Sequence, residues 1–290
     1  MNFLLALCAI VIEFTLDGVV SLRTPHWSGT WATRLASICA SRSFYRGWLG
    51  ALLLLGLPVL AVELGSDWLM GWSHPLYYLA SLGVLVWMLG PTDLNREIEE
   101  YRRSLYLTGD ERAAATPAFT TTTAGIDFGP PSGDEQFDAC RAELAALALS
   151  AERAWFAPLF WFFVCGPAGA VAYRLAVSLE RAPQVEASIA VALSCLHEAL
   201  AFIPARITAI NLGIAGTLLP VLEGAPAAGV FRWGASAALV ARSALAATDY
   251  GRVHDGSGDD PHLYRLNQMR ALVRRALNVW MALLAILAVT

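Results

Sequence analysis

The sequence predicts an all-α integral membrane protein, a polytopic bundle of about five to six spans with a helical insert on the cytoplasmic side. Composition is the first observation that predicts this class. Of 290 residues, 57% are hydrophobic and only 15% are charged, whereas roughly a quarter of a soluble domain is charged. The mean hydropathy is +0.52. A chain of this composition exposes more surface to lipid than to water.

The lengths of the apolar runs are the second observation, because about 20 apolar residues cross the hydrocarbon layer. The runs occupy residues 2–20, 48–64, 75–89, 155–177, 189–222 and 276–288. The second and third runs are separated by a glycine-containing segment, 65–71, which predicts the turn of a transmembrane hairpin. Pro204 predicts a broken helix in the fifth run, and the pattern leaves open whether that run crosses fully or re-enters.

Arginine placement is the third observation, because cytoplasmic loops are enriched in basic residues. Four arginines follow the first run, at positions 23, 34, 42 and 46, and further arginines lie between 96 and 153. We therefore expect a bacterial inner-membrane protein with both termini outside and residues 91–152 in the cytoplasm. The expected parts are transmembrane helices 1–3 (1–90), the insert (91–152), helices 4 and 5 (153–222), a cytoplasmic amphipathic segment (223–270) and a C-terminal transmembrane helix (271–290).

The insert has helical periodicity at both ends. Apolar residues recur three or four positions apart at Leu94, Ile98, Tyr101 and Leu105, and again at Phe137, Cys140, Leu144 and Leu147. The segment 116–133 between them is rich in Thr, Gly and Pro and predicts a flexible loop. The insert is therefore expected to extend helices 3 and 4 into the cytoplasm.

Polar residues inside the apolar runs predict a ligand-binding pocket, because ionisable groups in a membrane usually mark a function or an internal pair. The candidates are Glu13, Asp17, Arg174, His197, Glu198, Arg206 and Asn211. Glu13 and Asp17 are four residues apart and share one helix face. Arg206, just beyond Pro204, is the favoured position. The alternatives are interhelical pairing, for instance of Glu13 with Arg206, and snorkelling of Arg174 to a span end.

Several functions are disfavoured by residues that the sequence lacks. All 20 basic residues are arginine, which removes a phosphate-loop lysine and a Schiff-base lysine. The five cysteines have no metal-ligand spacing. We expect no catalytic residue, no metal and no cofactor. The net charge of −4 gives no basic field for nucleic acid. The expected partners are the lipid bilayer and a small anionic ligand or a membrane protein.

Two segments carry a resemblance to a known superfamily. They are Ala157-Pro-Leu-Phe-Trp-Phe-Phe-Val-Cys-Gly-Pro-Ala-Gly-Ala-Val-Ala-Tyr-Arg174 and Ile203-Pro-Ala-Arg-Ile-Thr208. They resemble the superfamily shared by the CobD/CbiB-type amide synthases of cobalamin biosynthesis and AmpE, a regulatory modulator of β-lactamase induction. The resemblance covers most of the chain by topology, but only these two segments are specific.

Departures from the synthase pattern favour the AmpE branch. Where the synthases have Glu-Asn-x-x-Asp-Gly, this chain has Leu149-Ser150 and Arg153-Ala154, and their Asn-Thr-Leu-Asp-Ser-Met is replaced by Val177-Ser-Leu-Glu-Arg-Ala182. The Ile12-Glu-Phe14 segment also looks like the first span of AmpE. The resemblance implies a non-catalytic signalling protein of β-lactamase regulation, the antibiotic response and peptidoglycan recycling. Two alternatives are a transporter or flippase of a cell-wall fragment and an amide synthase of the CobD/CbiB type.

Overall fold

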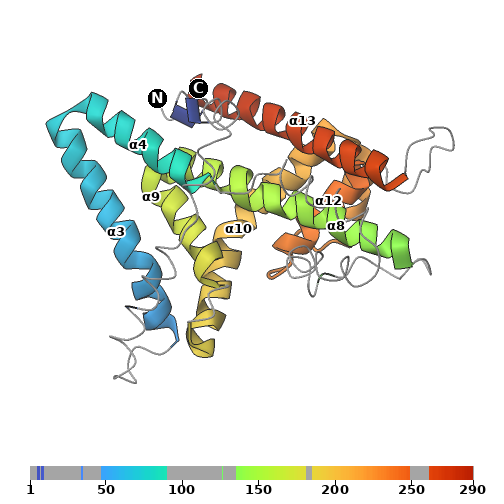
Figure 1. Cartoon of the computed structure of the whole chain (residues 1–290), viewed down its shortest axis with the longest axis horizontal. Helices are drawn as coiled ribbons and strands as arrows, with labels where there is room; N and C mark the ends of the chain where they lie inside the picture. The colour runs from blue at the N-terminus through green and yellow to red at the C-terminus, as the bar shows by residue number, and fades with distance from the viewer. Residues whose placement is uncertain are drawn as a thin grey trace. The chain divides into compact units, whose positions relative to one another are not determined.

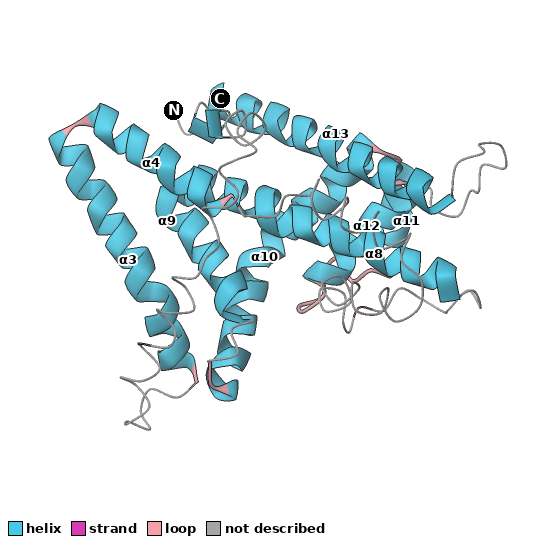
Figure 2. Ribbon diagram, in the orientation of Figure 1, coloured by secondary structure: helices cyan, strands magenta, loops and turns pink. Residues whose placement is uncertain are grey.

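The computed structural model describes residues 47–89, 135–180, 185–248 and 261–289, with isolated positions at 5, 6, 8, 9, 34 and 126. Every regular element in this part of the chain is a helix (Figure 2), which confirms the all-α class. Three helices are long and apolar enough to cross a membrane: α3 (Trp48–Trp72), the continuous helix Cys140–Glu180, and α10 (Ala187–Ala215). Most of the first apolar run lies outside the described residues, so the number of spans stays a prediction.

The chain divides into two compact units, one of residues 1–91, 153–201 and 284–290 and the other of residues 92–152 and 202–283. In the first unit α3 and α4 (His74–Met88) pack against each other and against α9 (Ala157–Glu180). Figure 1 shows α3 and α4 meeting at a sharp corner. The large side chains Leu60, Trp68 and Trp72 of α3 are more than half exposed, as expected of a helix that faces lipid.

The predicted turn at 65–71 is wrong, because α3 continues as a helix to Trp72. The corner lies instead at Ser73, whose backbone is extended (φ −162°, ψ 118°). A glycine inside a helix costs only about 1 kcal/mol relative to alanine, so the glycines of this segment do not end α3. Pro75 is tolerated in the first turn of α4, where its missing N–H has no helical acceptor. The corner therefore lies at the extended Ser73 between the two helices, and Pro75 is compatible with the start of α4.

The predicted break at Pro204 is also wrong, because α10 runs through this residue as one helix. Proline lacks the N–H that would bind the carbonyl four residues earlier, which here belongs to Leu200. Trp161 of α9 donates its indole Nε1–H to that oxygen at 2.9 Å. A neighbouring helix thus satisfies the acceptor that the proline leaves free, and this is how membrane helices tolerate proline.

The interruption in the described helices lies in α9 instead. Gly166 has φ 66° and ψ −159° inside that helix and precedes Pro167. This region of backbone conformation is accessible to glycine and to almost no other residue. The residue before a proline also avoids the α conformation. The Gly-Pro pair therefore kinks the first of the two segments that carry the family resemblance.

The second unit contains α8 (Glu135–Ala151), the second half of α10, α11 (Leu218–Gly224), α12 (Ser236–Ala247) and most of α13 (Pro261–Val289). α12 packs against α8 and α11. The helix predicted from residues 137–147 is confirmed as α8, which continues through a π-helical turn, Glu152–Phe156, into α9. Within the predicted amphipathic segment 223–270 the structure contains α12. The last apolar run is the end of α13. The helix predicted near 94–105 and the loop 116–133 lie outside the described residues, apart from Ile126.

Candidate functional site

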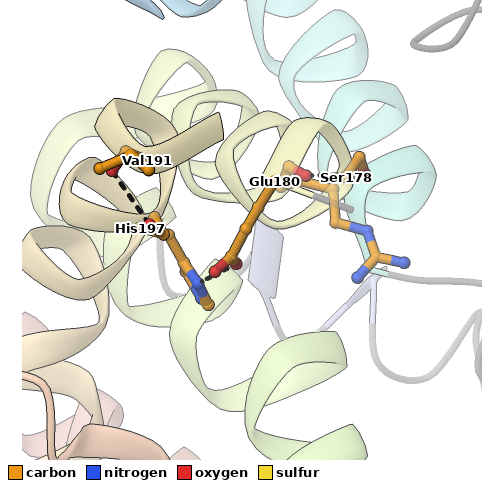
Figure 3. Close-up of polar contacts among 6 residues, drawn as sticks. Ser178, Glu180, Val191 and His197 are labelled. Atoms are coloured by element: carbon orange, nitrogen blue, oxygen red, sulfur yellow. Dashed lines mark hydrogen bonds and ion pairs between the residues drawn. The ribbon is translucent and has the colours of Figure 1, made fainter. Parts of the chain in front are cut away.

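An ion pair joins two helices of the first unit. Glu180, the last residue of α9, reaches His197 on α10, and its Oε2 lies 2.6 Å from Nδ1 of the imidazole (Figure 3). The His197 side chain is 11% exposed and that of Glu180 is 28% exposed. Because a carboxylate only accepts hydrogen bonds, Nδ1 carries the hydrogen that this contact requires. The pair is sheltered from water on the histidine side and partly open on the glutamate side.

The second nitrogen of His197 faces a different environment. Its Nε2 is buried and has no hydrogen-bond partner among the described residues. The ring of Tyr173 lies edge-on to the imidazole, with centroids 5.8 Å apart and planes at 62°. Tyr173 also belongs to a core cluster with Ala157, Val177 and Ala201. His197 is therefore fixed on one side by a carboxylate and on another by an aromatic ring, while its buried Nε2 has no hydrogen-bond partner in the described part of the chain.

The sequence predicted His197 and Glu198 as neighbours in a pocket but missed Glu180. Consecutive residues point about 100° apart around a helix, so the partner of a helical histidine usually comes from another element. Glu198 is partly exposed. Glu180 lies in the Val177–Ala182 segment, which departs from the synthase pattern. An acid at the end of an apolar helix, opposite a histidine in the next one, was the signal that could have identified it.

Arg174 lies on α9 and is partly buried. Its Nη1 donates to the carbonyl of Arg153 at 3.4 Å, and its own carbonyl accepts a hydrogen bond from Ser178 at 2.9 Å. Arg153 lies in the π-helical turn before α9, where carbonyls are displaced from regular helical bonding. Arg174 therefore binds a backbone carbonyl within its own unit.

Arg206 binds backbone in the second unit. Its guanidinium donates to the carbonyl of Val230 at 2.9 Å, to that of Arg232 at 3.2 Å and to the hydroxyl of Ser236 at 2.7 Å. It also donates to the carbonyl of Phe202 and stacks over that ring, 3.4 Å from the centroid. The residue favoured from the sequence thus holds the segment before α12 against α10.

Asn211 joins two helices of the same unit. It is 1% exposed, and its Nδ2 donates to the carbonyl of Ala276 on α13 at 2.8 Å. Its Oδ1 and the hydroxyl of the buried Thr208, one turn earlier, have no hydrogen-bond partner within the described residues. An internal water is the usual partner of such groups. The hydrogen bond to Ala276 links α10 to α13.

The candidate residues are divided between the two units. Arg174, His197 and Glu198 belong to the first and Arg206 and Asn211 to the second, whereas positions 13 and 17 lie outside the described residues. That all seven line one pocket stays a prediction. Within the described part of the chain, no three His, Cys, Asp or Glu side chains gather as they would to hold a metal ion.

Long apolar helices with sparse, internally bonded polar groups define the chain as a helical membrane protein. The profile of one family, described as regulatory signalling modulator protein AmpE, matches residues 23–227. The chain belongs to the AmpE family. The match includes the Glu180–His197 pair and Arg206. No match was found among curated proteins or solved structures, and the wider relation to the CobD/CbiB superfamily stays a prediction.

Proposed function

We propose that this protein is a non-catalytic signalling modulator of the bacterial inner membrane, linked to β-lactamase induction and cell-wall recycling. Membership of a family of regulatory signalling modulators supports the signalling part. The link to β-lactamase rests on the resemblance to AmpE. The proposed action is that a ligand or a membrane partner binds polar residues between the helices and changes how those helices pack.

The observation that carries the proposal is the Glu180–His197 pair. A carboxylate 2.6 Å from Nδ1 fixes the orientation of the imidazole, because the hydrogen bond holds the ring on that side. The buried Nε2 is the atom of this ring that we propose for hydrogen bonding to the ligand. The pair joins the end of α9 to α10, so a ligand at Nε2 would act on the contact between these helices.

An induction assay tests the proposed function. A host strain lacking its own copy is supplied with wild-type protein or with His197→Phe, at matched membrane levels, and β-lactamase activity is measured after inducer is added. We expect wild type to change the induction and His197→Phe to lose that effect. Glu223→Gln, at an exposed acid of α11, is the control and should behave as wild type. Induction that is the same with and without the wild-type protein would refute the proposal.

Native mass spectrometry of the detergent-purified protein tests for the ligand. A small molecule that accompanies wild type and Glu223→Gln but not His197→Phe would place a ligand at this histidine. Its mass would distinguish a cell-wall fragment from a corrinoid, and a corrinoid would revive the amide-synthase alternative. Protein without any bound small molecule in all three samples would favour a membrane partner over a small ligand.

The transporter alternative is favoured by one observation, the interruption of α9 at Gly166. Transporters commonly bind substrate where transmembrane helices are discontinuous. Those folds pair such breaks in inverted repeats, and among the described helices we find the one in α9. Uptake of a labelled cell-wall fragment into proteoliposomes, abolished by Gly166→Val, would favour transport over signalling.

A further inference from the structure

The chain that follows α10 turns back along the same helix. As it advances from Leu218 to Trp233, its neighbours on α10 recede from residue 213 to residue 202. The paired positions are Leu218 with Gly213, Ala228 with Ala209, Val230 with Arg206 and Trp233 with Phe202. Residues 218–233 therefore run antiparallel to the second half of α10. Eleven residues of helix correspond to a descent of about 17 Å.

α12 then returns in the opposite direction. Its first residue, Ser236, contacts Arg206, and Leu239 packs with Ala209. At its end the carbonyl of Ala247 accepts a hydrogen bond from the backbone N–H of Thr217 at 3.2 Å, just beyond α10. Residues 218–247 thus form a hairpin with a partly irregular descending arm and a helical ascending arm, which we call the α11–α12 hairpin.

The α11–α12 hairpin exposes large apolar side chains. The exposed fractions are 40% for Leu218, 66% for Leu219, 51% for Leu222, 93% for Phe231 and 57% for Trp233. Along the same stretch, α10 exposes Ile203, Ile210 and Ile214, each by about half. α10 is long and apolar enough to cross a membrane. The hairpin and the part of α10 beside it therefore both expose apolar side chains.

Many backbone carbonyls of the irregular arm are satisfied by hydrogen bonds within the protein. The carbonyls of residues 224, 225, 226 and 229 accept hydrogen bonds from N–H groups of the same segment, that of Ala227 from Arg242 at 2.8 Å, and those of Val230 and Arg232 from Arg206. A water-exposed loop needs no such arrangement, because water binds free carbonyls. At membrane depth irregular backbone is tolerated only when its polar groups are satisfied by protein.

We propose that the α11–α12 hairpin is re-entrant: it enters the membrane beside α10, and its tip, with Phe231 and Trp233, contacts lipid acyl chains. The exposed Arg232 lies between them in the chain, and its long stem allows the guanidinium to extend toward the polar surface of the membrane. This assignment takes residues 223–247 out of the water-exposed cytoplasmic segment that the sequence predicted, and it is independent of the proposed signalling role.

Spin-label accessibility in liposomes tests the proposal. The full-length chain, with its five cysteines replaced by alanine, receives a single nitroxide at Phe231→Cys or at Glu223→Cys and is reconstituted in phosphatidylethanolamine and phosphatidylglycerol. Residue 231 is almost fully exposed, so the label removes little packing. We expect the ratio of oxygen to nickel-chelate collisions to be higher at 231 than at 223. A low ratio at 231, typical of water, overturns the proposal, and so does protection from both reagents, which indicates a protein partner.

A second measurement tests the part played by Arg206. Arg206→Gln removes donors from the carbonyls of Val230 and Arg232, so the label at 231 should become more mobile and its collision ratio should fall. Arg274→Gln removes one arginine from an exposed position of α13 and should leave both values unchanged. An unaltered label in Arg206→Gln, in protein that elutes from gel filtration as wild type does, contradicts the proposal that this arginine holds the tip in lipid.

Discussion

The indole N–H of Trp161 binds the carbonyl oxygen of Leu200 at 2.9 Å, the acceptor that Pro204 leaves without a helical donor. One residue of α9 thus compensates for a proline in α10, and the two helices are linked at the position where α10 would otherwise be weakest. A proline in a helix interior costs about 3 kcal/mol or more when the freed carbonyl finds no partner.

Trp161→Phe should lower the free energy of unfolding by about 1–3 kcal/mol, because it leaves the carbonyl of Leu200 unsatisfied. The same substitution in a Pro204→Ala background should cost much less, since the N–H of the new alanine can bind that carbonyl. Unfolding in mixed micelles, followed by circular dichroism, measures all four proteins of this double-mutant cycle. Equal costs in the two backgrounds would show that the indole hydrogen bond and the proline are not coupled.

Gly166→Ala should destabilise the protein by about 1–3 kcal/mol, because Gly166 has a backbone conformation that alanine rarely adopts. A Cβ at this position would meet no atom within 4 Å, so the cost is conformational and not steric. Gly56, inside α3, also has free space around it. There the same substitution should stabilise by about 0.5–1 kcal/mol. Thermal unfolding of the two variants should give shifts of opposite sign, and a gain in stability at 166 would contradict the interpretation.

Helix positions in this fold could be predicted from the sequence, but the continuity of α10 through Pro204 could not. Run length and apolar content identified α3, α9 and α10 because these properties are local. Whether Pro204 breaks α10 depends on Trp161, 43 positions earlier, which happens to reach the freed carbonyl. The break at Gly166 could have been predicted, because Gly166 precedes Pro167 and a Gly-Pro dipeptide commonly marks a turn or break.

For the candidate site, as for the fold, only some features could be predicted from the sequence. Arg174, His197 and Arg206 could be singled out from the sequence as polar residues in apolar runs, but their partners could not be derived. Glu180 lies 17 positions before His197, and the acceptors of Arg206 are mostly backbone carbonyls. A backbone acceptor cannot be recognised from the sequence, because every residue has one.

Gly216→Ala should destabilise the second unit by about 1–3 kcal/mol. An added Cβ would overlap the carbonyl oxygen of Ala247 at the end of α12, and backbone cannot move away without disturbing the helix. At Gly213 the nearest atom to an added Cβ is Cδ1 of Leu218, at 2.8 Å, which a rotation of that side chain can relieve. Gly213→Ala is therefore the milder variant. Comparing the unfolding of the two checks the close approach of α12, and equal effects would contradict it.

Glu180→Gln should lower the free energy of unfolding by about 1–2 kcal/mol, because it weakens a charge-assisted hydrogen bond to a sheltered imidazole. The estimate lies above that for an exposed pair, since the His197 side chain is only 11% exposed. In a cycle with His197→Gln the two losses should not add, as expected for residues in contact. Glu223→Gln, at an exposed acid, should change stability by less than about 0.5 kcal/mol. Additive losses at 180 and 197 would mean that the two side chains act separately, and the imidazole proposed to bind the ligand would then not be held by this carboxylate.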